Sequence, residues 1–118
     1  MKEISLYIRP EDFSKVVGIL RKNNVGGITF FETNGSGRKK HEPVPERVRA
    51  YMTGRMITPE FVKGTKVEVI VPDSSADQIV EDILDNLGTA HGMIFVKDVS
   101  GAYEIGTKLK GESVLTPK

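Results

Sequence analysis

A short run of glycines and cations is the stretch of this sequence with the clearest chemical potential. Its members are Gly35, Ser36, Gly37, Arg38, Lys39 and Lys40. Glycines let a backbone approach an anion closely and direct successive N–H groups at it. The arginine adds a planar fork of donors that matches phosphate oxygens, and the lysines add point charges. The pattern predicts a site for phosphate or another small anion, although a strand-end turn with solvated charges explains it equally well.

Catalytic chemistry finds little support elsewhere in the chain. The only histidines are His41 and His91, and cysteine is absent. No Ser/His/Asp spacing stands out, thiolate metal sites are excluded, and the carboxylates are scattered along the sequence. We therefore expect neither an enzyme nor a metal site.

Length and charge describe one domain with a cationic central region. A chain of 118 residues can bury a sizeable single core. The formal net charge is only +1, which argues against a general nucleic-acid binder. Residues 37–66, however, hold eight lysines and arginines against three glutamates, a net +5, which leaves −4 for the remainder. We expect an anion to bind at this central segment.

The absence of cysteine and of long apolar stretches bears on the compartment. A chain without cysteine forms no disulfides and suits a reducing cytosol. The N-terminal residues alternate in polarity, unlike a secretory signal, and no run reaches the roughly 20 apolar residues of a membrane span. These features predict a cytoplasmic protein that does not insert into a membrane.

The first half of the chain reads as strand, helix and strand. Aliphatic residues at every second position predict a strand over residues 2–8. Pro10 suits the first turn of the amphipathic helix that follows, which ends before a pair of glycines. Aromatic and β-branched side chains predict the second strand over residues 27–33.

The second half repeats this order. Alternating valines predict a strand over residues 65–71, and Ser74 with Asp77 resembles a capping box that opens a helix ending at Gly88. A final strand is predicted over residues 93–99. Two such units joined by a long central segment predict an α+β, ferredoxin-like fold, a sandwich built from a duplicated βαβ unit.

In such a fold one face of the sheet carries both helices and the other is open. The strands that read GITFF and MIFV have apolar residues on both sides, so some of them would face outward. Packing of sheet face against sheet face in a homo-oligomer would cover them. The alternative is a C-terminal segment that folds back as a lid, and we favour the oligomer.

Residues 36–63 form a long central segment without clear periodicity. Loops of this length inside a compact domain are usually functional or disordered. We expect an exposed, mobile, cationic arm that becomes ordered when it meets a partner or a ligand.

The element order and several motifs resemble the PII nitrogen-regulatory signal-transduction family over about residues 1–112, with residues 113–118 as a C-terminal tail. The motifs are Thr29, Gly35-Ser36-Gly37-Arg38-Lys39-Lys40, Lys66-Val67-Glu68-Val69-Ile70-Val71, Gly92-Met93-Ile94-Phe95-Val96 and Gly111-Glu112. The resemblance implies a homotrimer that binds an adenine nucleotide in clefts between subunits. It also implies a non-catalytic signalling protein whose long loop, the T-loop, contacts a transporter or a metabolic enzyme.

The resemblance also implies which residues bind the nucleotide. It places Thr29 and Glu68 near the adenine of ATP, ADP or AMP. The phosphates would lie near the GSGRKK run, and the family's second phosphate loop matches residues 88–95, which adds Gly92. Lys108 and Lys110 would contribute from the C-terminal stretch.

Three departures from the family motifs bear on the ligand. Lys39 stands where the family has a glutamine that ligates Mg²⁺ beside 2-oxoglutarate, and an ammonium has no lone pair for a cation. Met93 replaces a phosphate-binding lysine, while Lys108 and Lys110 replace paired arginines. These changes argue against Mg²⁺ and 2-oxoglutarate and for a cationic cleft tuned to a different anion.

The leading hypothesis is therefore a regulatory protein in which a nucleotide or other small anion changes the state of the T-loop and so its docking onto a partner protein. The alternative is a nucleic-acid-binding ferredoxin-like module, because such sheets can stack bases. The strands GITFF and MIFV lack the aromatic-and-glycine pattern of an RNP1 motif, which favours the first hypothesis.

Overall fold

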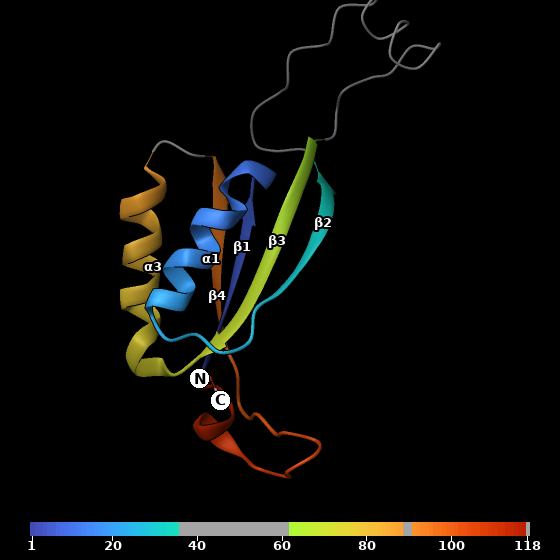
Figure 1. Cartoon of the computed structure of the whole chain (residues 1–118), viewed down its shortest axis with the longest axis vertical. Coiled ribbons are helices and arrows are strands. Elements are labelled where there is room, and N and C mark those ends of the chain that lie inside the picture. The colour runs from blue at the N-terminus through green and yellow to red at the C-terminus, as the bar shows by residue number, and fades with distance from the viewer. Residues whose placement is uncertain (36–61, 89–90, 118) are drawn as a thin grey trace, which may run out of the picture.

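A computed structural model describes residues 1–35, 62–88 and 91–117, and in these residues two helices cover one face of a four-stranded antiparallel sheet (Figure 1). The strands are β1 (Lys2–Ile8), β2 (Thr29–Gly35), β3 (Val62–Val71) and β4 (Gly92–Asp98), and the helices are α1 (Phe13–Lys22) and α3 (Asp73–Leu87). The strand order β2-β3-β1-β4 is that of a ferredoxin-like sheet. The predicted fold class is confirmed.

The core lies between the sheet and the helices because the strand registers place aliphatic residues opposite one another. Ile4 pairs with Val69 and Leu6 with Val67, and their side chains are at most 2% exposed. Each side chain of this kind stabilises the fold by about 1.5–3 kcal/mol when it leaves water. The alternation seen in the sequence is therefore the cause of the helix-covered face.

Helix α1 follows a 3-10 turn that begins at Pro10. Its buried residues are Val16, Ile19 and Leu20, which recur at helical spacing and face the sheet. At its end Asn23 donates one side-chain hydrogen bond to the carbonyl of Ile19 and another to the carboxylate of Asp82 in α3. The helices are thus joined by a polar contact as well as by packing.

Helix α3 begins at Asp73, two residues earlier than a capping box with Ser74 as its N-cap predicted. Pro72 is the N-cap, and no side chain caps the helix with a hydrogen bond at this position. The hydroxyl of Ser75 donates a hydrogen bond to the carbonyl oxygen of Pro72. The predicted box at Ser74 is wrong, because the fixed, extended backbone of proline already ends the strand and starts the helix. Gly88 ends the helix with a φ of +51°, as predicted.

The two strands beside the central segment extend further toward it than the sequence indicated: β2 lies two residues later than predicted, and β3 begins three residues earlier. β2 runs to Gly35, which pairs with Val62 at the start of β3. Val62 and Lys63, which we had assigned to the central segment, therefore belong to a strand, since antiparallel neighbours add hydrogen-bonded pairs up to the connection. The predicted mobile arm lies otherwise outside the described residues.

Residues 102–111 form a hairpin-like projection, called the C-terminal arm below. Its backbone is closed by hydrogen bonds from Gly111 N–H to Ala102 and from Glu104 N–H to Leu109. The arm lies beyond the end of the sheet where both chain ends lie (Figure 1). Gly35 and Val62, which flank the central segment, pair at the opposite end of β2 and β3. Helices long and apolar enough to cross a membrane do not occur in the described part of the chain.

Candidate functional site

The structure separates the predicted site residues into three groups. Ser36, Gly37, Arg38, Lys39 and Lys40 lie outside the described residues. A second group sits on the sheet and consists of Thr29, Gly35, Glu68 and Gly92. Lys108 and Lys110 form the third group, on the C-terminal arm.

Thr29 and Glu68 are brought together by the pairing of β2 with β3. They face each other directly in the antiparallel register. Val67 and Val69, on either side of Glu68, point into the core, so Glu68 and its cross-strand partner lie on the open face. Side chains opposed in this way have Cβ atoms about 4.5–5.5 Å apart. A hydroxyl and a carboxylate thus stand within reach of one ligand.

A lysine that the sequence analysis left out of the site completes this arrangement. The Nζ atom of Lys66 lies 2.8 Å from Oε1 of Glu68, and both side chains are partly buried. Hydrogen bonding to Glu68, and then to Tyr7, raises the pKa of Lys66 above its ordinary value. The sequence carried a signal only for its proximity to Glu68, because Lys66 and Glu68 both occupy the polar side of an alternating strand.

The two glycines on the sheet, Gly35 and Gly92, differ in how much space a side chain would have at their positions. A Cβ atom at position 92 would lie 2.4 Å from the carbonyl oxygen of Tyr7, so packing against β1 alone requires glycine there. A Cβ atom at Gly35 would meet nothing within 4 Å. Packing therefore explains Gly92 without a ligand and leaves Gly35 available for a close approach of backbone to anion.

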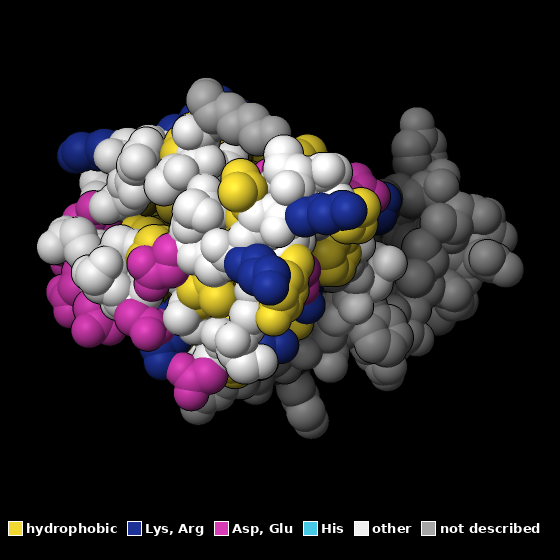
Figure 2. All heavy atoms as spheres, turned by 90° about the horizontal axis from the view of Figure 1, so that it is seen from below, with side chains coloured by type: hydrophobic (Ala, Val, Ile, Leu, Met, Phe, Trp, Pro, Cys, Tyr) yellow, Lys and Arg dark blue, Asp and Glu magenta, His cyan; other side chains and the backbone are white. Residues whose placement is uncertain are grey.

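The two lysines of the third group are not on the open face. Lys108 has a left-handed backbone with a φ of +62°, and Lys110 pairs with Tyr103 across the arm. Figure 2, seen from below, shows lysines and apolar side chains gathered on this arm and acidic side chains on the side of α3. Ile105 at the turn of the arm is 96% exposed. An arm of this composition is suited to contact another molecule.

The open face carries the exposed apolar residues that the strand patterns predicted. Phe31, Met93 and Phe95 are each 44–48% exposed, and Phe95 packs edge-on against Tyr7. The C-terminal segment does not cover them, so the lid alternative is wrong for the described residues. Among the same residues the hydroxyl of Ser5 is buried on this face without a hydrogen-bond partner. The oligomer remains a prediction.

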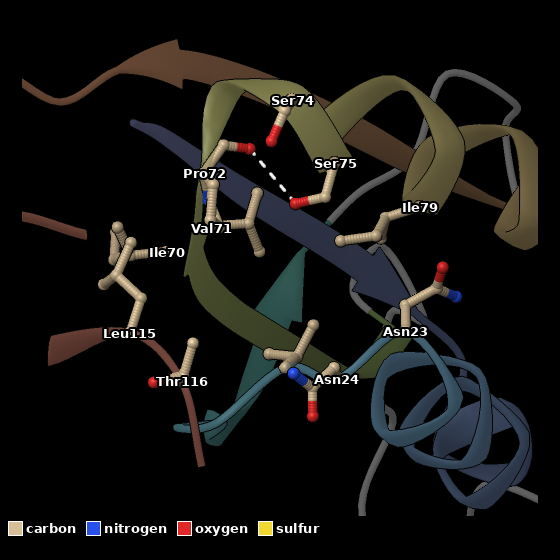
Figure 3. A pocket seen from close by; sticks show the side chains of 11 residues that line it. Asn23, Asn24, Ile70, Val71, Pro72, Ser74, Ser75, Ile79, Leu115 and Thr116 are labelled. Atoms are coloured by element: carbon tan, nitrogen blue, oxygen red, sulfur yellow. Dashed lines mark hydrogen bonds between the residues drawn. The ribbon is translucent and has the colours of Figure 1, made fainter. Parts of the chain in front are cut away.

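A cavity of about 250 Å³ lies away from these residues, at the end of the sheet near the chain ends (Figure 3). It is lined by aliphatic side chains such as Val25 and Ile79, with hydroxyl and amide groups from Asn24, Ser74 and Thr116. No predicted site residue lines it, and its lining holds no charged side chain. Within the described ranges, histidines and carboxylates form no cluster that could hold a metal ion.

Comparison with known proteins places these features in one family. The family model described as nitrogen regulatory protein P-II matches residues 1–108. The nitrogen regulatory protein P-II of Haemophilus influenzae is 32% identical over 118 residues, covering 98% of this chain and all of the relative. The P-II protein of Nostoc punctiforme is 33% identical and P-II 1 of Escherichia coli 32% identical, each over 91% of this chain and 93% of the relative.

Proposed function

This chain belongs to the nitrogen regulatory protein P-II family, and we propose that it regulates a partner protein in response to an adenine nucleotide or a similar small anion bound between subunits. The observation that carries the proposal is the pair of Thr29 and Glu68, which the sheet register brings together on the open face. The GSGRKK run begins at Gly35, the last residue of β2, and the first residue of the same strand is Thr29. One strand thus leads from the proposed base-binding residues to the proposed phosphate-binding ones.

The residues present are chemically suited to an adenine nucleotide. The hydroxyl of Thr29 can donate or accept a hydrogen bond, and the carboxylate of Glu68 accepts from amino or hydroxyl groups of a base or sugar. Arg38 and Lys40 would hold the phosphates by charge-assisted hydrogen bonds, which contribute about 1.5–3 kcal/mol each. In this proposal the bound nucleotide supplies charge and contacts and acts as a signal, not as a substrate.

We further propose that the protein is a cytoplasmic homotrimer. Phe31, Met93 and Phe95 leave the open face too apolar for a free surface, and facing sheets would cover it. Lys108 and Lys110 are exposed on the C-terminal arm, beyond the end of their own sheet. They would therefore contact a nucleotide bound in a cleft with a neighbouring subunit. A complete site then needs residues of two copies.

Regulation would follow from contacts that the ligand makes with only one state of the T-loop. A ligand shifts an equilibrium only by its difference in affinity for the two states. Phosphates bound at Arg38 and Lys40 would favour the loop conformation in which both side chains reach them. Lys39, in the place of a metal-ligating glutamine, argues against a requirement for Mg²⁺ or 2-oxoglutarate. Family membership favours this function over the nucleic-acid-binding alternative.

Isothermal titration calorimetry with ATP, ADP and AMP, each with and without Mg²⁺, tests the proposal. Arg38→Ala should weaken binding by about 1.5–3 kcal/mol, which is roughly one to two decades in Kd. Lys15→Ala, which removes an exposed cation on α1, is the matched control and should bind like wild type. Light scattering should give the mass of a trimer for all three proteins. Absence of heat with every nucleotide, or a monomeric mass, would contradict the proposal.

A further inference from the structure

Lys66, in β3, is enclosed by groups from three adjacent strands of the sheet, β2, β3 and β1. Its ammonium lies 5.3 Å from the ring centre of Tyr7 in β1 and 5.5 Å from that of Phe31 in β2. Both residues are its direct cross-strand partners, one on each side. Glu68, two residues further along β3, completes the enclosure with its carboxylate.

This enclosure fixes the position of the cation. An ammonium over an aromatic face is attracted by the electron density of the ring, more strongly the further it is desolvated, and here two rings contribute. The side chain of Lys66 is only 20% exposed, whereas an ordinary surface lysine moves freely. Surface ion pairs are weak partly because two mobile side chains lose conformational entropy when they pair. Lys66 is already restricted by the two rings, so its ion pair with Glu68 costs less entropy.

The same enclosure decides what Lys66 can do for a ligand. Its charge already faces a carboxylate and two rings, so it is poorly placed to receive a phosphate. What it can orient is the carboxylate of Glu68, because Oε1 of that carboxylate lies 2.8 Å from Nζ and accepts from it. Glu68 shares one rung of the β2–β3 ladder with the residue directly opposite it. That residue is Thr29.

We propose that Lys66 is a positioning residue that holds the Glu68 carboxylate beside Thr29 and thereby sharpens recognition of the base-and-sugar end of a nucleotide without contacting the phosphates. This inference rests on the proposed function, since it assigns to the same site a residue that acts on the ligand only through Glu68. It predicts that one substitution, at Lys66, lowers the affinity for the base-and-sugar end of the nucleotide but not the affinity for its phosphates.

Binding of ATP and of inorganic tripolyphosphate, measured by calorimetry on the full chain, separates the two ends. Lys66→Met keeps the length and apolar stem of the side chain and removes its charge. We expect it to weaken ATP binding about tenfold, equivalent to one hydrogen bond of ordinary strength, and to leave tripolyphosphate binding within about twofold of wild type. Lys66→Arg retains a cation and should recover most of the ATP affinity.

The matched control is Lys97→Met. Lys97 forms the same kind of ion pair on the same sheet face, with Nζ 2.9 Å from Oε2 of Glu3, but on a different rung from Thr29. Its loss should leave both affinities unchanged. Equal weakening by Lys66→Met and Lys97→Met would assign the effect to the face as a whole and overturn the positioning role.

A measurement on the ligand-free protein tests the enclosure itself. Two rings over the ammonium should move the ε-methylene proton resonances of Lys66 upfield, and Tyr7→Leu should remove part of that shift. Resonances at the position of a free lysine would overturn the inference whatever the nucleotide does. If wild type binds ATP but Lys66→Met binds it equally well, only the inference fails. If wild type binds neither compound, the proposed function fails and takes the inference with it.

Discussion

The two faces of the sheet differ in what they are built from and in what they need. The helix-covered face is made of aliphatic side chains such as Ile4, Leu6 and Val67, all fully buried within one chain. The open face carries aromatic rings, methionine, and ion pairs that remain partly exposed. One face is fully buried in a single copy, whereas the other leaves Phe31, Met93 and Phe95 nearly half exposed. The residues of the core and the residues of the proposed site therefore lie on opposite sides of the same strands.

The largest expected effect is on the helix-covered face. Leu6→Ala leaves a cavity at a position with no exposure and should lower the free energy of unfolding by about 2–5 kcal/mol. Urea denaturation followed by circular dichroism measures this loss. A cost below 1 kcal/mol would show that this face is not the core and would remove the contrast between the faces.

A smaller loss is expected where β4 approaches β1. Gly92→Ala would push a methyl group against the carbonyl of Tyr7, and overpacking of this kind costs about 1–3 kcal/mol. The control is Gly18→Ala on the exposed side of α1, where nothing lies within 4 Å and alanine should stabilise the helix by up to about 1 kcal/mol. Equal stabilities for both variants would return Gly92 to the list of ligand-binding glycines.

The open face should respond in assembly more than in stability. Phe95→Ser removes an edge-on contact with Tyr7, which contributes about 0.5–1.5 kcal/mol to the single chain. Analytical ultracentrifugation should show loss of the proposed trimer in this variant, because a hydroxyl replaces apolar surface that would meet another copy. A variant that sediments as wild type would exclude the sheet face as the subunit interface.

The smallest effect is expected at the contact between the helices, and it depends on pH. Hydrogen bonds from Asn23 and then Gln78 lower the pKa of Asp82 below its ordinary value. A lowered carboxyl pKa stabilises the fold above the unfolded pKa, near 4, and this contribution disappears as the pH falls through the folded value. The stability of Asp82→Asn, measured by unfolding, should therefore lie below that of wild type at neutral pH and converge with it as the pH falls through the folded pKa of Asp82. Asp85→Asn, on the same helix, is the control, and a constant difference would argue against the linkage.

Local patterns were sufficient to predict the elements of this fold. Alternation at Ile4, Leu6 and Ile8, helical spacing after Pro10 and the glycine at position 88 each reflect a constraint that acts within a few residues. The capping box at Ser74 failed because the proline before the helix was the stronger local signal. The predicted boundaries of β2 and β3 were wrong by two or three residues. The last residues of these two strands are ordered by pairing with each other, which their own composition does not reveal.

The candidate site could be predicted only in part, because it is assembled across strands. Thr29 and Glu68 lie far apart in sequence, and a family resemblance pointed to both before any register was known. Lys66 was missed as a site residue, since its role depends on having Tyr7 on one neighbouring strand and Phe31 on the other. Nothing in the spacing of three residues on three strands reveals that they share one row of the sheet.

The position of the chain ends has a practical consequence. Lys2 pairs with Val71 and Asp98 at one end of the sheet, while Gly35 and Val62, which flank the central segment, pair at the other. A fluorescent reporter or a surface anchor fused to either end would thus be held a full strand length from the points where that segment leaves the domain. Such fusions should report on, or display, a docking event without obstructing it.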